Sequence, residues 1–189
     1  MILLHGRGSS PEDILTLADE IGRKDIAYIA PAATGNTWYP VGFLNPVARN
    51  EPYLSSALRV ISELMAGLGE QAFPPEGVVL AGFSQGACLS LEYAARFAQR
   101  FGGVVGLSGG LIGPPGTPRV YPGDFAGTPV FLGCSDVDFH IPKERVHETR
   151  EVLTGMGAHV TERLYPGLGH TVSPDEVMFV RRMLAALAG

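Results

Sequence analysis

Residues 77–87 read Gly77-Val78-Val79-Leu80-Ala81-Gly82-Phe83-Ser84-Gln85-Gly86-Ala87, an apolar strand pattern that runs through Gly-x-Ser-x-Gly into a helical pattern. This order predicts a tight strand-to-helix turn that exposes the serine hydroxyl at the N-terminus of a helix. A side chain at either glycine would collide with the neighbouring strand and helix. The stretch therefore predicts that Ser84 is a nucleophile, with an ordinary glycine-rich turn as the alternative.

A second Gly-x-Ser-x-Gly match surrounds Ser108 and also follows an apolar strand pattern. The residues that follow distinguish the two matches. Ser84 precedes apolar residues at helical spacing, whereas Ser108 precedes Gly109-Gly110-Leu111-Ile112-Gly113-Pro114-Pro115, which cannot begin a helix. Ser84 is the preferred nucleophile on this ground.

The composition describes a compact protein, with 46% hydrophobic and 17% charged residues in 189 positions. We expect one domain over residues 1–189, no leader segment, and no membrane span, because the apolar runs are shorter than the ~18 residues required. A net charge of −5 argues against a nucleic-acid surface. Two isolated cysteines, Cys88 and Cys134, predict buried free thiols in a reducing compartment, the cytoplasm by default. No spacing of His, Asp or Cys suggests a metal site.

Strand and helix patterns alternate along the chain. Apolar stretches predict six strands, at residues 1–5, 26–30, 77–82, 103–108, 129–133 and 160–165. Helices are expected between them, and Ser10-Pro11-Glu12-Asp13 is a helix start signal. This alternation predicts an α/β fold in which helices cover both faces of a mainly parallel sheet.

Two long irregular segments leave the expected C-terminal ends of strands, where ligands bind in such sheets. The first, residues 31–52, contains Trp38 and Phe43, and the second, residues 109–128, contains Leu111. Long loops in compact domains are usually functional, so these three side chains are candidate substrate contacts. The alternative for Trp38 and Phe43 is that they anchor their own loop.

A serine nucleophile requires a positioned base, and the base requires a carboxylate that orients it. His170 lies in a glycine-rich loop between the last strand and the last helix and is the candidate base. His140 is a candidate substrate contact. The carboxylate should follow the strand at 129–133, where both Asp136 and Asp138 occur, and spacing alone does not choose between them.

The developing oxyanion requires two N–H donors. The backbone N–H of Gln85, at the helix N-terminus, is one candidate. The other is the N–H of Arg7 in His5-Gly6-Arg7-Gly8, because glycines on both sides let the backbone approach the site.

These motifs together resemble the phospholipase/carboxylesterase family of α/β-hydrolases, which includes bacterial carboxylesterases and acyl-protein thioesterases. The motifs that carry the resemblance are Leu3-Leu4-His5-Gly6-Arg7-Gly8, Gly82-Phe83-Ser84-Gln85-Gly86-Ala87, Gly133-x-x-Asp136, Ile141-Pro142 and Gly169-His170. The resemblance implies a cofactor-independent serine esterase or thioesterase that acts on a small-molecule ester. It also implies a triad of Ser84, an Asp and His170, with Arg7 and Gln85 as oxyanion donors.

The chain departs from the family pattern in three places. The pattern Gly-x-x-Asp-x-x-Val-Pro is two residues longer here, so counting from Gly133 selects Asp136 and counting back from Ile141-Pro142 selects Asp138. Asp136 is preferred because the strand end should determine where the acid lies. The usual N-terminal edge strands are expected to be missing, and the resulting sheet edge leaves a homodimer open. The segment from Trp38 to Asn50 matches no thioesterase substrate groove, which weakens an assignment as a protein deacylase.

Two other functions remain alternatives. The same residues could cleave an amide or a carbon–carbon bond, or the chain could be a non-catalytic binder of small apolar ligands on a hydrolase scaffold. A complete set of candidate triad residues favours the esterase.

Overall fold

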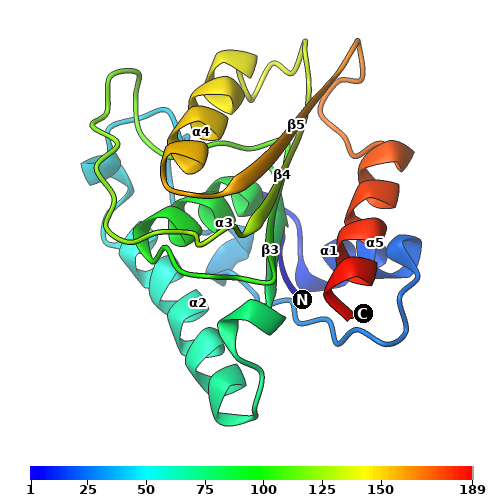
Figure 1. Ribbon diagram of the computed structural model, residues 1–189. Helices are drawn as coiled ribbons and strands as arrows, with labels where there is room; N and C mark the ends of the chain where they lie inside the picture. The colour runs from blue at the N-terminus through cyan, green and yellow to red at the C-terminus, as the bar shows by residue number, and fades with distance from the viewer. Residues whose placement is uncertain (189) are drawn as a thin grey trace.

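The computed structural model describes residues 1–188 and is built around a parallel five-stranded sheet (Figure 1). The strands lie in chain order across the sheet: β1 (Ile2–Leu4), β2 (Val79–Phe83), β3 (Gly103–Leu107), β4 (Pro129–Ser135) and β5 (His159–Tyr165). The first four are largely buried, as expected for strands that are covered on both faces.

The sixth expected strand, at residues 26–30, is reduced to a single β-bridge between Ile29 and Ile2. Ile29 accepts a hydrogen bond from the Leu3 N–H (2.8 Å) and donates one to the Met1 carbonyl (3.0 Å). Pro31 has no N–H with which to extend the pairing. The prediction of a parallel α/β sheet is confirmed, with five strands and one bridge instead of six strands.

Helices cover both faces of the sheet (Figure 1). One face carries α1 (Pro11–Ile21) and α5 (Pro174–Ala188), and the other carries α2 (Tyr53–Glu70), α3 (Gln85–Arg96) and α4 (Lys143–Gly155). Side chains alternate between the two faces: Leu3 packs under α1 and α5, whereas Ile2 and Leu4 join the core under α2 and α3. No helix within residues 1–188 has the length and apolar character needed to cross a bilayer.

The predicted start of α1 is confirmed. Ser10 is the N-cap, its hydroxyl accepts a hydrogen bond from the Asp13 N–H (3.3 Å), and Pro11 occupies the first helical position. The first segment expected to be irregular contains two short 3₁₀ turns, Thr34–Asn36 and Val47–Asn50, and the second contains a single β-bridge residue, Gly123, which pairs with Ala98. Both segments leave the C-terminal ends of strands or bridges, where the site is built.

The N-terminus of α5 contains a buried carboxyl group that should make stability depend on pH. Glu176 accepts a hydrogen bond from the Ser173 N–H (2.6 Å), while the Ser173 hydroxyl accepts one from the Glu176 N–H (3.3 Å). Burial raises the pKa of Glu176 above its ordinary value of 4.5. The folded protein therefore holds this proton more tightly than the unfolded chain, and the free energy of unfolding should fall as pH rises through that window.

Glu176→Gln should remove this loss, because the amide oxygen still accepts the Ser173 N–H and carries no charge. Urea unfolding from about pH 5 to about pH 8 should show a flatter pH dependence in the variant than in the wild type. Glu144→Gln, an exposed acid in the first turn of α4, is the control. Parallel curves for wild type and Glu176→Gln would contradict the assignment.

Candidate active site

Ser84 lies at the turn between β2 and α3, in the backbone conformation φ 55°, ψ −117°. Residues other than glycine rarely adopt a positive φ, and such strain persists only where the surroundings enforce it. Here the Ser84 N–H donates to the Leu107 carbonyl (2.9 Å), and the Ser84 carbonyl accepts from the Cys88 N–H (3.0 Å). The turn is thus held on both sides, by β3 and by the first turn of α3.

The flanking glycines allow this turn to pack. A Cβ atom on Gly86 would overlap the carbonyl oxygen of Leu4 in β1, and one on Gly82 would overlap the backbone of Gly86. The collision expected from the sequence therefore involves backbone atoms of the neighbouring strand and helix, which cannot move aside.

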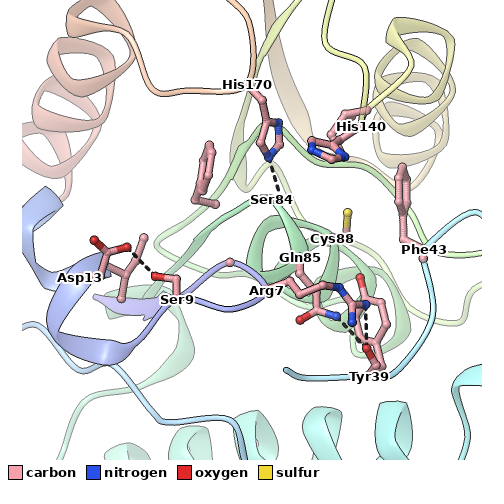
Figure 2. A pocket seen from close by; sticks show the side chains of 15 residues that line it. Arg7, Ser9, Asp13, Tyr39, Phe43, Ser84, Gln85, Cys88, His140 and His170 are labelled. Carbon is pink, nitrogen blue, oxygen red and sulfur yellow. Dashed lines mark hydrogen bonds between the residues drawn. The ribbon is translucent and has the colours of Figure 1, made fainter. Parts of the chain in front are cut away.

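His170 connects Ser84 to a carboxylate. Its Nε2 lies 2.9 Å from Ser84 Oγ, and its Nδ1 lies 2.7 Å from Asp138 Oδ2 (Figure 2 shows the Ser84 contact). The histidine ring is largely buried and lies against Phe83, with ring centroids 4.9 Å apart. Because a carboxylate accepts the Nδ1 proton, Nε2 is left free to accept the proton of the Ser84 hydroxyl.

The Asp138 carboxylate is buried and accepts three hydrogen bonds. Besides His170, the N–H groups of His140 (2.8 Å) and Ile141 (3.0 Å) donate to its Oδ1. Burial pushes the pKa of Asp138 upward, but the hydrogen bonds from His170 and the two backbone N–H groups outweigh it. The net pKa is below the ordinary value of 3.8. The group is therefore a carboxylate at neutral pH.

Asp136, the preferred acid in the sequence analysis, does not contact His170. Its Oδ1 accepts the N–H of Gly167 (2.8 Å), and the alternative acid Asp138 occupies the position beside the histidine. The physical reason is the length of β4. The strand runs two residues beyond Gly133, and Ser135 still pairs with Tyr165 of β5, so counting from Gly133 places the acid two residues too early.

Ser108, in the second Gly-x-Ser-x-Gly motif, is not part of the group formed by Asp138, His170 and Ser84. Ser108 follows β3, its side chain is fully buried, and its N–H donates to the Gly133 carbonyl (2.7 Å). His170 contacts Ser84 and not Ser108.

A cavity of about 390 Å³ opens beside Ser84. Figure 2 shows Phe43 and Tyr39 on one side of the serine, and Ser9 and Asp13 on the other. His140 and His170 lie at the upper rim in this view. The cavity lining also includes Cys88 and Ile141, which belong to the same hydrophobic cluster as Phe43, so this part of the lining is apolar.

Of the three candidate substrate contacts in the two long loops, Trp38, Phe43 and Leu111, only Phe43 lines this cavity. The structure places Trp38 elsewhere: its indole Nε1 donates to the His5 carbonyl (2.9 Å), its ring packs in the core, and it borders a separate groove. The Leu111 side chain is fully buried, and its backbone is held in place: the N–H donates to the Thr149 hydroxyl (3.0 Å) and the carbonyl accepts from Arg145 (2.6 Å). The assignments of Trp38 and Leu111 as substrate contacts are therefore corrected.

Other lining residues were not assigned from the sequence. Tyr39, adjacent to Trp38, lines the cavity, as do Phe83 and Ile141. Phe83 lies inside the serine motif and Ile141 lies three residues after Asp138, so closeness to the motifs is the signal that the sequence offers. His140, a candidate substrate contact, does line the cavity, and its ring lies edge-on to His170 at 4.7 Å.

Arg7 and Gln85 both border the cavity, and their side chains hold the same loop. The Tyr39 carbonyl accepts from Arg7 Nη2 (2.8 Å) and from Gln85 Nε2 (2.8 Å), as the dashed lines in Figure 2 show. Gln85 Oε1 also accepts the Trp38 N–H (3.0 Å). These bonds attach the loop that carries Tyr39 and Phe43 to the two segments that flank Ser84.

The backbone at Arg7 is oriented by its neighbours. The Gly6 carbonyl accepts hydrogen bonds from His5 Nδ1 (2.8 Å) and from the Ser9 N–H (3.2 Å). In a trans peptide the C=O and the following N–H point in opposite directions, so these two bonds also determine where the Arg7 N–H points. The Gln85 N–H opens α3 and so has no partner within the helix.

Comparison with known proteins agrees with this geometry. The model of the family described as phospholipase/carboxylesterase matches residues 1–188. The crystal structure of a phospholipase/carboxylesterase from Dyadobacter fermentans is similar, with a TM-score of 0.93 and 43% identity, over 97% of this chain and 88% of that one.

Two curated relatives are acyl-protein thioesterases 1. The protein from Eremothecium gossypii is 26% identical over 211 residues, covering 98% of this chain and 88% of the relative. The protein from Gibberella zeae is 36% identical over 116 residues, a match that spans 58% of this chain and only 49% of that relative. With its family match over nearly the whole chain, the protein belongs to the phospholipase/carboxylesterase family of ester-cleaving α/β-hydrolases.

Proposed function

We propose that the protein hydrolyses small to medium acyl esters through a covalent acyl intermediate on Ser84. The observation that carries this proposal is the continuous path from Asp138 through His170 to Ser84, with contacts of 2.7 Å and 2.9 Å. Thioesters are the alternative substrate class, supported by the relatives named as thioesterases. The same serine chemistry serves both bonds, so the leaving group decides between them.

The reaction proceeds in two halves. Ser84 Oγ attacks the ester carbonyl carbon while His170 Nε2 takes the hydroxyl proton. Asp138 stabilises the imidazolium that results. The tetrahedral intermediate then collapses, the proton passes from His170 to the departing alkoxide, and the alcohol leaves. In the second half, His170 takes a proton from water, the hydroxide attacks the acyl-Ser84 carbon, and the acid is released as Oγ recovers its proton.

The oxyanion would be stabilised by the N–H groups of Gln85 and Arg7. The first belongs to the unsatisfied donors of the α3 N-terminus, where the helix dipole also favours negative charge. The second is directed by the hydrogen bonds that hold the Gly6 carbonyl. Each such donor is worth about 2.7–4 kcal/mol of transition-state stabilisation in serine hydrolases.

The apolar side of the cavity would hold the acyl chain. Phe43→Leu replaces an aromatic ring by a smaller branched side chain and should therefore enlarge the cavity on this side. With p-nitrophenyl esters from acetate to decanoate, the variant should shift the ratio of kcat/KM for longer over shorter chains upward by about tenfold. Measured ester by ester, this profile also gives the acyl-length preference of the wild type.

Phe73→Leu is the matched control, since Phe73 is half-exposed in the turn after α2 and lies outside the cavity. An unchanged chain-length profile in Phe43→Leu would show that Phe43 only anchors its loop. A wild type that binds esters without turning them over would favour the non-catalytic binder.

The cellular setting is also a proposal. Cys88 and Cys134 are both free and buried, and burial raises the pKa of each thiol to about 12, so neither is a nucleophile at neutral pH. Two unpaired thiols support a reducing compartment such as the cytoplasm. We also propose that residues 1–189 form one domain and that the protein dimerises through the β1 edge, where, among residues 1–188, the single bridge to Ile29 is the pairing that covers β1.

A further inference from the structure

The loop that carries His170 has little packing of its own. Residues 166–169 follow β5, and Pro166 and Gly167 are exposed. Gly167 (φ 66°) and Gly169 (φ 79°) both adopt left-handed conformations, and no heavy atom beyond the adjacent residues lies within 4 Å of the position that a Cβ would take on either. Glycines in open space can take many other conformations, so the observed one needs specific contacts to hold it.

Two side-chain oxygens at the end of β4 provide these contacts. Asp136 Oδ1 accepts the Gly167 N–H (2.8 Å), and Ser135 Oγ accepts the Gly169 N–H (3.1 Å). Both anchors are themselves fixed, because Ser135 pairs with Tyr165 and the Asp136 N–H donates to the Tyr165 carbonyl (3.2 Å). The Gly169 N–H, which Ser135 Oγ accepts, belongs to the residue directly before His170.

The acid that contacts the His170 ring lies in the same short segment as Ser135 and Asp136. Asp138 follows Asp136 by two residues, and it contacts the His170 ring itself. One short segment, residues 135–138, therefore holds both the ring of the histidine and the backbone of its loop. A shift of this segment would move the base and its carboxylate together, and it would leave Ser84 in place.

We propose that Asp136 and Ser135 are positioning residues that hold the His170 loop so that Nε2 stays within hydrogen-bond reach of Ser84. This inference rests on the proposed function, in which His170 is the base. It assigns to Asp136 a role that requires a hydrogen-bond acceptor and no negative charge, in contrast to the role of Asp138.

The conservative variant Asp136→Asn tests whether Asp136 acts as a hydrogen-bond acceptor or through its charge. Asp136→Asn keeps a carbonyl oxygen that can accept the Gly167 N–H, whereas Asp136→Ala removes the acceptor. We expect Asp136→Ala to lower kcat by roughly 10- to 100-fold, the range for a misplaced catalytic group, with KM within about twofold. Asp136→Asn should keep at least about half of the wild-type kcat. Ser135→Ala should resemble Asp136→Ala, because it also frees one N–H of the loop.

The control is Asp124→Asn and Asp124→Ala, a carboxylate that likewise accepts a backbone N–H, that of Ala126, in a loop before β4. Neither change should alter kcat. A wild-type kcat in Asp136→Ala would overturn the inference, as would a loss in Asp136→Asn as large as that in Asp138→Asn. Wild-type turnover that survives in Ser84→Ala would instead overturn the proposed function, and with it this inference.

Discussion

Ser84→Ala is expected to lower kcat/KM for p-nitrophenyl butyrate by about 10⁴-fold or more, because the acyl group then has no atom on which to form the covalent intermediate. What remains should be slow attack by water, assisted by the oxyanion donors and by binding alone. The change removes one hydroxyl from a turn held by backbone bonds to Leu107 and Cys88, so the fold should persist. Initial rates beside a thermal unfolding curve test both statements.

Ser108→Ala is the matched control for this variant. Ser108 also lies in a Gly-x-Ser-x-Gly sequence after a strand, and it also has a positive φ, of 51°. Its hydroxyl is buried away from the cavity, so turnover should remain. Loss of turnover in Ser108→Ala, with full turnover in Ser84→Ala, would transfer the nucleophile to the other motif.

Asp138→Asn is expected to lower kcat by roughly 10⁴-fold while the fold around the residue stays the same. An amide at this position would present N–H to His170 Nδ1 and favour the tautomer with the proton on Nε2. That tautomer cannot accept the proton of Ser84. Because the pKa of Asp138 lies below 3.8, the wild-type carboxylate is charged through neutral pH. The loss should therefore persist from about pH 5 to about pH 8.

Comparing the Asn variants of Asp136 and Asp138 shows which of the two aspartates orients His170. Asp138→Asn should be nearly inactive under conditions in which Asp136→Asn remains active. The reverse result would restore Asp136 as the triad acid, despite its contact with Gly167 in place of His170.

Those parts of the site that depend on local sequence could be predicted. The Gly-x-Ser-x-Gly turn, the helix start at Ser10 and the glycine-rich loop of His170 are each specified by residues within a few positions of one another. Their conformations follow from backbone sterics and capping, which act over one turn of chain. The positions of Arg7 and Gln85 at the cavity follow in the same way, from the loops that contain them.

The errors all concern contacts between segments that are distant in the sequence. The end of β4 is set by its partner, because Ser135 pairs with Tyr165, and no local signal marks this extension. The long loop that contains Trp38 suggests a substrate contact, but the Trp38 indole donates to the carbonyl of His5, 33 residues earlier. The backbone N–H and carbonyl of Leu111 are held by hydrogen bonds to Thr149 and Arg145 in α4, with the side chain in the core. In each case a tertiary hydrogen bond determined the outcome.

Whether Ser84 is the activated nucleophile is tested by labelling the protein with a fluorophosphonate and locating the adduct by peptide mass spectrometry. The reagent phosphonylates a serine only where a base activates the hydroxyl and donors stabilise the oxyanion. We expect one adduct, on the peptide that contains Ser84; it should disappear in Ser84→Ala and form much more slowly in Asp138→Asn. An adduct on Ser108, or no adduct in a preparation that hydrolyses esters, would contradict this expectation.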